Sequence, residues 1–350
     1  MKAITTIPGT AGSAQLDDLE APTAGPGEML VQGISMGVCG TDHEILDGRY
    51  GWLPPGKERL VLGHESLGRV IEAPTESGFS PGDLVVGYVR RPDPVPCIAC
   101  AVGQWDMCRN GLYVEHGIKA LDGFGAQRYV VSADAAIRVP DQLGHLGVLV
   151  EPASILAKAW DHIERIGGRA AWAPHRVLVT GAGPVGLLAA LFAHQRGHEV
   201  HVLDHVTDGP KPGLVADLGA TYHSGAAADA CPGADVVIEC TGVGQLVFDV
   251  LTVTAAAGIV CLTGVSSGGR TLSLDAGAIN REIVLENDVV FGSVNANATH
   301  YRAAVETLAR ADPAWLGRVI TRTVPLADWT SAFERRDDDV KVVIDLESDT

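Results

Sequence analysis

From Arg176 to Gly186 the chain reads RVLVTGAGPVG, and the fold of the middle of the chain can be predicted from this stretch. The apolar run ending at Thr180 predicts a buried strand, and Pro184–Arg196 predicts the helix that follows it. The glycines between them fit a G-x-G-x-x-G pattern in its strand–turn–helix context, in which a helix N-terminus faces a pyrophosphate. A chance glycine cluster is the alternative. The predicted dinucleotide-binding residues are Gly181, Gly183, Pro184, Val185 and Gly186.

Further strands and helices alternate downstream of this stretch. Strands are predicted at Glu199–Leu203, Ala234–Glu239 and Gly258–Leu262, with helical segments between them. Such alternation is typical of a parallel, doubly wound sheet, so the middle of the chain is predicted to be an α/β Rossmann domain.

An acidic residue follows the second predicted strand. Asp204 lies about 20 residues past the glycine pattern, where a carboxylate binds the adenosine ribose hydroxyls and repels a 2′-phosphate. His205 and Val206 follow it, without an arginine. The sequence therefore favours NAD over NADP, with His205 as a group that softens the choice. An ordinary strand-end aspartate is the alternative.

The two ends of the chain differ from its middle. The first 90 residues read as short strands broken by turns, and a loop rich in proline and cysteine covers Pro92–Asn110. Helices are predicted at Ser154–Arg165 and His300–Arg310, with closing strands through Leu346. We expect a β-rich catalytic domain of residues 1–160 and 297–350, with the nucleotide domain of residues 161–296 inserted into it. Ligands are then expected in the cleft between the two domains.

Three distant residues have the chemistry of a catalytic metal site. Cys39, His64 and Glu151 offer a thiolate, an imidazole and a carboxylate, and zinc accepts all three. Glu65, beside His64, is expected to coordinate the metal, hold its water or orient the site. Taken singly, Cys39 reads as a small buried residue and Glu151 as a surface acid; only the joint pattern indicates zinc.

Zinc beside an alcohol oxygen lowers the pKa of that alcohol, and the proton then needs an acceptor. Thr41, two residues after Cys39, is the expected first acceptor, with Glu44 or a water behind it. Thr41 also has the sequence context of a helix cap, and the two roles are compatible.

The composition, net charge and cysteine content make some classes of partner and cellular location unfavourable. The 350 residues are 46% hydrophobic with a net charge of −17, which disfavours nucleic acids and anionic membranes as partners. The N-terminus lacks the apolar region of a signal peptide, and no apolar run approaches the roughly 20 residues that span a bilayer. We expect a cytoplasmic protein whose seven cysteines serve as metal ligands or free thiols.

The chain resembles the zinc-dependent medium-chain alcohol and polyol dehydrogenases, and among them the archaeal-type glucose 1-dehydrogenases. The resemblance covers essentially the whole chain, and its more specific signatures are Cys39–Ile45, Gly63–Arg69, Val114–Ile118, Val150–Ser154, Ile279–Glu282 and Gly292–His300.

This resemblance implies a GroES-like catalytic domain joined to the Rossmann domain, and catalytic zinc on Cys39, His64 and Glu151 with Glu65 at the metal or its water. It implies that Glu115, Glu151 and His300 contact the sugar and that Thr241 and Asn295 contact the cofactor. Without it, Glu115 reads as a surface acid and His300 as an ordinary histidine at a helix start.

The chain departs from the family pattern at two places. The family's structural zinc loop commonly carries four cysteines, whereas this chain keeps Cys97, Cys100 and Cys108 and has Pro94 in place of the first. Asp93 is a candidate oxygen ligand, and a second, structural zinc is left open. Asp204-His205-Val206 stands where many of these enzymes have Asn-Arg-Arg for NADP, which again favours NAD.

The function expected from residues and resemblance together is hydride transfer from a sugar or polyol hydroxyl to NAD. The best candidate is C1 of D-glucose or a related aldose, giving the lactone. Alternatives are a dehydrogenase of another secondary alcohol or cyclitol, a zinc-free enoyl or quinone reductase, and a non-catalytic NAD-binding protein. The resemblance suggests a homodimer or homotetramer, with the apolar stretch Ile283–Val294 read as a strand at an interface.

Overall fold

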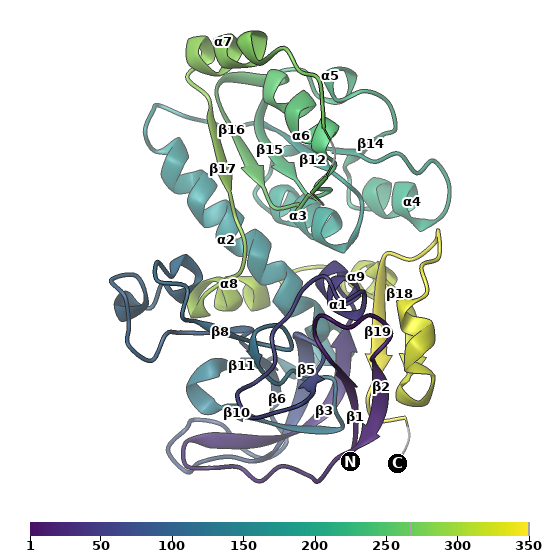
Figure 1. The fold of residues 1–350 in the computed structure, drawn as a ribbon. Helices are drawn as coiled ribbons and strands as arrows, with labels where there is room; N and C mark the ends of the chain where they lie inside the picture. The colour runs from purple at the N-terminus through teal and green to yellow at the C-terminus, as the bar shows by residue number, and fades with distance from the viewer. Residues whose placement is uncertain (267, 270, 349–350) are drawn as a thin grey trace. The chain divides into compact units, whose positions relative to one another are not determined.

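The computed structural model describes residues 1–266, 268–269 and 271–348. It divides into two compact units, one made of Met1–Ser154 with Asn295–Thr350 and the other of Ile155–Val294 (Figure 1). The sequence had suggested boundaries at residues 160 and 297.

The second unit is built on a six-stranded sheet in the order β14-β13-β12-β15-β16-β17. All of its neighbouring strands run parallel, which confirms the predicted doubly wound sheet. The strands are β12 (Arg176–Thr180), β13 (Glu199–Leu203), β14 (Thr221–His223), β15 (Ala234–Glu239), β16 (Thr254–Leu262) and β17 (Val289–Gly292).

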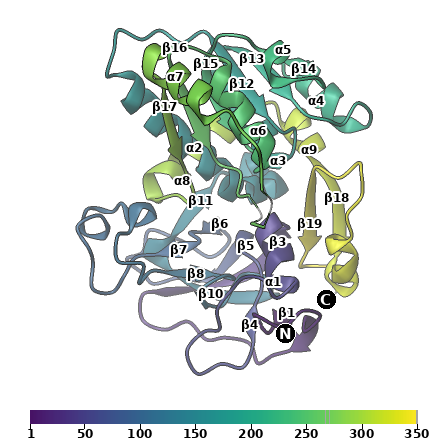
Figure 2. The ribbon, with the colours of Figure 1, turned by 45° about the horizontal axis from the view of Figure 1, so that its top comes forward.

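Helices cover both faces of this sheet (Figure 1; Figure 2). Leu178, Val237 and Val260 share one face and pack with residues of α5, η5 and α7. Val179, next along β12, faces the other side, where α3 approaches it. The helices are α2 (Val150–Gly167), α3 (Pro184–Gln195), α4 (Pro210–Asp217), α5 (Ala227–Ala230), α6 (Gly244–Asp249), η5 (Val250–Thr252) and α7 (Ala276–Glu286).

The first unit is built mainly of short strands. Its largest sheet has the order β11-β6-β5-β3-β19-β18, with β10 also paired to β3. Only the β18–β19 pair within it is parallel among the described residues, so this unit has the antiparallel character expected of the β-rich domain. The strands are β3 (Glu28–Gly37), β5 (Glu65–Glu72), β6 (Leu84–Gly87), β10 (Arg128–Ser132), β11 (Ala136–Val139), β18 (Ile320–Pro325) and β19 (Lys341–Asp345).

Two three-stranded sheets and several short helices complete this unit. The sheets have the orders β2-β1-β4 and β7-β8-β9. Their strands are β1 (Lys2–Thr6), β2 (Gln15–Asp18), β4 (Leu60–Val61), β7 (Arg90–Arg91), β8 (Val114–His116) and β9 (Ala120–Leu121). The helices are α1 (Gly40–Leu46), η1 (Cys100–Val102), η2 (Trp105–Met107), η3 (Ala133–Ala135), η4 (Asp141–Leu149), α8 (Ala298–Ala309), α9 (Pro313–Val319) and η6 (Leu326–Phe333).

One expectation about local structure was wrong. Ile283–Val294 is not a single strand, because α7 continues to Glu286 and only Val289–Gly292 forms β17. The helix ends where Asn287 takes a left-handed conformation with φ of 58°. The apolar residues of this stretch therefore belong to two elements. Among the described residues, no helix combines the length and apolar character needed to cross a membrane.

Candidate active site and metal centre

Cys39, His64 and Glu65 come together in the first unit. Their ligand atoms all lie within 4.8 Å of one another. Cys39 directly precedes α1, His64 follows β4, and Glu65 is the first residue of β5. Pairing of β3 with β5 places Glu65 opposite Gly37, two residues before Cys39, which explains why distant residues of the chain meet here.

Acidic groups crowd this cluster. Asp42 is fully buried in α1, accepts a hydrogen bond from the Cys39 backbone N–H at 2.9 Å, and has a carboxylate oxygen 3.3 Å from Nδ1 of His64. Burial lowers the pKa of His64, yet Asp42 and the Cys39 sulfur raise it well above its usual value. A divalent cation would neutralise this negative charge, and thiolate, imidazole and carboxylate are zinc ligands, so the residues present fit zinc.

Glu151, the fourth predicted ligand, is the second residue of α2 and is buried. Its carboxylate is not within the 4.8 Å cluster, although it is close enough to interact electrostatically with Glu65 and His64. Burial, and then the charge of Glu65, raises the pKa of Glu151 to about 7. Thr41 and Glu44 both lie half-buried on α1, three residues apart and so on neighbouring positions of one helix face.

Sequence reasoning missed Lys341 on β19. Its ammonium group is buried, contacts Oε2 of Glu65, and donates to the backbone oxygen of Val38 at 2.9 Å. A side chain at Gly37 would collide with both partners, because a Cβ there would lie 2.9 Å from Cε of Lys341. A lysine more than 270 positions from Glu65 in a plain strand sequence carries no local signal of this contact.

Close backbone packing holds the segment before His64. Gly63 has φ of 95°, and a Cβ on it would lie 2.1 Å from the sulfur of Met36. A Cβ on Gly117 would lie 2.4 Å from the backbone oxygen of Gly63, and one on Gly123 would lie 2.3 Å from the same atom. Only glycine fits these positions, so the backbone leading to His64 is held by direct contact with the segment after β8.

Glu115 on β8 and His300 on α8 are both buried in the first unit. Glu115 accepts hydrogen bonds from Nε of Arg90 at 3.0 Å and from Nδ2 of Asn295 at 2.8 Å. Asn295, which was expected to contact the cofactor, therefore donates its side-chain amide to Glu115. The backbone of Asn295 is left-handed, with φ of 63°. The reading of Glu115 as a surface acid does not hold.

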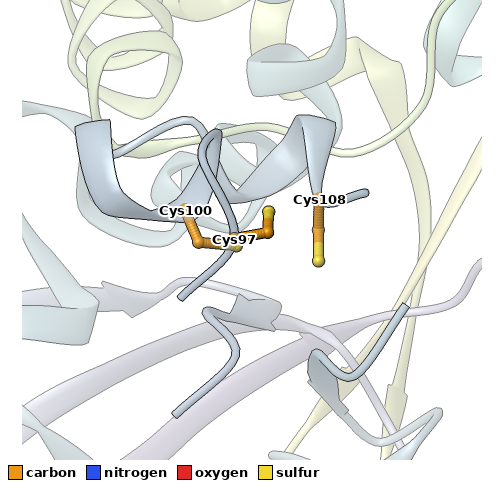
Figure 3. Close-up of side chains that lie close together, drawn as sticks. All are labelled: Cys97, Cys100 and Cys108. Atoms are coloured by element: carbon orange, nitrogen blue, oxygen red, sulfur yellow. The ribbon is translucent and has the colours of Figure 1, made fainter. Parts of the chain in front are cut away.

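The three cysteines of the loop, residues 92–110, also lie together (Figure 3). The sulfur atoms of Cys97, Cys100 and Cys108 lie within 4.8 Å of one another. Asp93, the candidate fourth ligand, is buried and engaged elsewhere: it accepts from the Val95 N–H at 2.9 Å and from the Asn110 amide. The structure thus brings the three thiols together without adding the Asp93 carboxylate to them.

The glycine pattern of the second unit forms the turn between β12 and α3. Gly181 has φ of 88°, and a Cβ on Gly186 would lie 1.8 Å from the Gly181 oxygen. Helix α3 begins at Pro184, directly after Gly183. The turn and the close helix–strand approach both require glycine, as the sequence predicted.

Asp204 lies after β13 and touches this turn. Its carboxylate accepts from the Ala182 N–H at 2.7 Å and from the Val206 N–H at 3.0 Å. Lys211, which sequence reasoning missed, places Nζ 3.2 Å from the same carboxylate. Burial opposes ionisation, but these hydrogen bonds and the Lys211 charge lower the pKa of Asp204. His205 is exposed and its ring lies 3.2 Å from Asp204.

Thr241 follows β15, and its position is set by Glu239, another residue that sequence reasoning missed. Glu239 is fully buried and accepts hydrogen bonds from Thr180 Oγ1 at 3.2 Å and from the Thr241 N–H at 2.8 Å. It also accepts from the Thr241 hydroxyl and from the Gly242 N–H. One carboxylate therefore ties the end of β12 to the loop after β15.

Comparison with known proteins agrees with this geometry. Residues 25–141 match the model of the alcohol dehydrogenase GroES-like domain, and residues 144–346 match that of the glucose dehydrogenase C-terminus. The chain is 37% identical over 357 residues to glucose 1-dehydrogenase of Methanocella arvoryzae, covering 99% of each chain. It is 37% identical over 344 residues to that of Halobacterium salinarum, covering 95% of this chain and 96% of the relative.

A solved structure is similar over the whole length. Haloferax mediterranei glucose dehydrogenase, determined in complex with NADP, Zn and gluconolactone, superposes with a TM-score of 0.91 at 31% identity, covering 99% of each chain. These matches confirm the family resemblance and the expected pair of GroES-like and Rossmann domains. The chain therefore belongs to the glucose dehydrogenase family and is an oxidoreductase of the zinc-dependent alcohol dehydrogenase fold.

Proposed function

We propose that this protein is a zinc-dependent sugar dehydrogenase that oxidises C1 of D-glucose or a related aldose to the lactone, with NAD as hydride acceptor. The observation that carries the proposal is the convergence of Cys39, His64 and Glu65 within 4.8 Å in a member of the glucose dehydrogenase family. The gluconolactone and zinc of the Haloferax relative support the same chemistry.

We assign a role to each of the predicted site residues. Cys39, His64 and Glu151 hold the metal, and Glu65 stands at the metal or its water. Zinc, when bound, supplies the Lewis acid that lowers the pKa of the sugar hydroxyl. The Thr41 hydroxyl would accept the proton of the sugar hydroxyl while passing its own proton toward Glu44, and NAD, when bound, would accept the hydride of the anomeric carbon. Glu115 and His300 bind the other hydroxyls.

The decisive test is metal-dependent reduction of NAD by sugars. Cys39→Ala and His64→Ala are expected to abolish turnover and to lose the catalytic zinc, while NADH binding, followed by its fluorescence, is retained. Turnover in either variant would refute the metal assignment. A panel of aldoses, polyols and cyclitols names the substrate; activity on a cyclitol alone would favour the alternative function as dehydrogenase of another secondary alcohol.

Preference for NAD is proposed from Asp204. Two backbone N–H groups stabilise the ionised form of its carboxylate, which repels a 2′-phosphate. Lys211 and His205 lie beside the carboxylate and attract a 2′-phosphate. Asp204→Ala should raise the relative affinity for NADP, and Asp204→Ala with Lys211→Met should lower it again. An unchanged NAD-to-NADP ratio in both variants would remove Asp204 from the argument.

We propose that Cys97, Cys100 and Cys108 would hold a second zinc through their thiolates, without Asp93, whose carboxylate is engaged elsewhere. Zinc content per chain tests this: two equivalents in the wild type and one in Cys100→Ser, with Cys231→Ser as the control. One equivalent in the wild type, kept by Cys100→Ser, would refute it. We predict that the protein forms a homodimer or homotetramer, which light scattering can test.

A further inference from the structure

A buried network in the first unit joins the cysteine loop to the residues proposed to bind sugar. Its centre is Asp106 in η2, between Cys100 and Cys108. Asp106 is buried, although the next residue, Met107, is exposed. Burying a carboxylate is costly unless charged or polar groups meet it, so the partners of Asp106 indicate its purpose.

Asn297, His300 and Arg90 all lie against Asp106. Its Oδ1 accepts from Nδ2 of Asn297 at 2.8 Å, and its Oδ2 lies 4.0 Å from Nδ1 of His300. Its backbone oxygen accepts from the Arg90 guanidinium at 3.2 Å. A single residue of the loop thus contacts both β7 and the start of α8.

Arg90 carries this contact to Glu115. Its Nε donates to Glu115 at 3.0 Å, and its guanidinium stacks on the Tyr113 ring with the central carbon 3.7 Å from the ring centre. Asn295 donates to the same carboxylate oxygen at 2.8 Å. Glu115 is thereby fixed by two donors, one of which depends on the position of Asp106.

Asn297 carries the contact to His300. It caps α8, and its backbone N–H donates to Nδ1 of His300 at 3.2 Å. Nδ1 is therefore the acceptor of that bond, and the ring carries its proton on Nε2. Because the Asn297 side chain donates to Asp106, the orientation of the cap, and with it the His300 ring, depends on the cysteine loop.

An aromatic contact supports the same connection. Trp105, beside Asp106, lies 6.1 Å from the Tyr88 ring centre, and Tyr88 lies 4.7 Å from Tyr301 on α8. The loop is thus packed against the helix that carries His300 by rings as well as by hydrogen bonds.

We propose that Asp106 is a positioning residue of the sugar site, holding Glu115 through Arg90 and His300 through Asn297, so that the cysteine loop sets sugar specificity. This rests on the proposed function, which assigns Glu115 and His300 to the sugar. A site that recognises several hydroxyls needs its polar groups held to about 0.5 Å, because discrimination comes from groups left unpaired by the wrong substrate.

The test compares Asp106→Leu, Asp106→Asn and the exposed control Asp141→Asn. We expect Asp106→Leu to raise KM for D-glucose roughly tenfold to a hundredfold, the loss of one charge-assisted hydrogen bond, with a smaller change in kcat. Discrimination between D-glucose and its monodeoxy analogues should fall. Asp106→Asn keeps one acceptor oxygen, so its KM for D-glucose should lie between those of the wild type and Asp106→Leu. NADH affinity and catalytic zinc content should not change in any of these variants.

Asn297→Ser gives an independent answer if Asp106→Leu does not fold. Serine still caps the helix but cannot donate to Asp106 in the same way, so the same loss of discrimination is expected. Unchanged KM and discrimination in Asn297→Ser and Asp106→Asn would overturn the inference. Failure of the proposed function looks different: the wild type, with zinc bound and NAD supplied as the hydride acceptor, would oxidise no sugar at all.

Discussion

At the scale of single residues, Lys341 compensates the charge of the proposed metal site. Removing its ammonium leaves the buried Glu65 carboxylate without its cation. We expect Lys341→Met to lower the free energy of unfolding of the metal-free protein by about 3 kcal/mol, measured by urea denaturation. Glu65→Gln added to Lys341→Met should recover part of this loss. Strictly additive effects of the two changes would show that the residues do not interact.

A second prediction for a single residue concerns Glu239. It accepts from backbone and hydroxyl donors around it, and an amide would set its own N–H against one of them. Glu239→Gln should cost about 2 kcal/mol of stability and weaken NADH binding, measured by fluorescence titration. AMP, which needs only the adenosine half of the site, should bind as before. Asp229→Asn, which changes an exposed side chain of α5, is the matched control; equal weakening of AMP binding would argue for general damage.

At the scale of elements, β8 presents two neighbouring side chains to different surroundings. Glu115 meets Arg90 and Asn295, whereas the His116 ring stacks on Phe124 with ring centres 4.4 Å apart. Burial lowers the pKa of His116 to about 4. An unfolded histidine titrates near 6.5, so between these values the unfolded state binds the extra proton. Stability that is present above pH 6.5 is lost as the pH falls toward 4.

His116→Gln should therefore flatten the acid side of the stability profile. One proton contributes a slope of about 1.4 kcal/mol per pH unit, and the variant should lack that contribution between pH 6.5 and 4. Urea denaturation at several pH values measures it. His145→Gln changes an exposed histidine and should keep the wild-type slope. An identical slope in His116→Gln would show that another group titrates there.

At the scale of the whole molecule, the two proposed ligands belong to different units. NADH should slow amide hydrogen exchange in peptides covering 181–186 and 204–206, because bound ligand suppresses local opening. Zinc should slow exchange in peptides covering 37–42 and 63–65. Mass spectrometry after addition and chelation distinguishes the two. Protection of 181–186 by zinc alone would contradict this assignment.

The sequence predicted the architecture better than it predicted the residues that hold the candidate site residues in place. The glycine pattern and the buried strands carry local signals, so the parallel sheet, α3 and the position of Asp204 were predictable. Lys341, Asp106 and Glu239 were not, because each acts through partners far away in sequence or through burial that composition does not reveal. Ile283–Val294 was misread because apolar content alone does not separate a helix end from a strand.

The glycines around His64 have a consequence for inherited variation. A Cβ on Gly117 or on Gly123 would meet the backbone oxygen of Gly63, and one on Gly63 would meet the Met36 side chain, so a replacement at any of the three needs a neighbour to move. Because each replacement displaces packed backbone, we expect natural variation to avoid these three positions. Relatives that act on other substrates are then expected to differ at the residues proposed to bind sugar, Glu115 and His300 among them, and to share the backbone before His64.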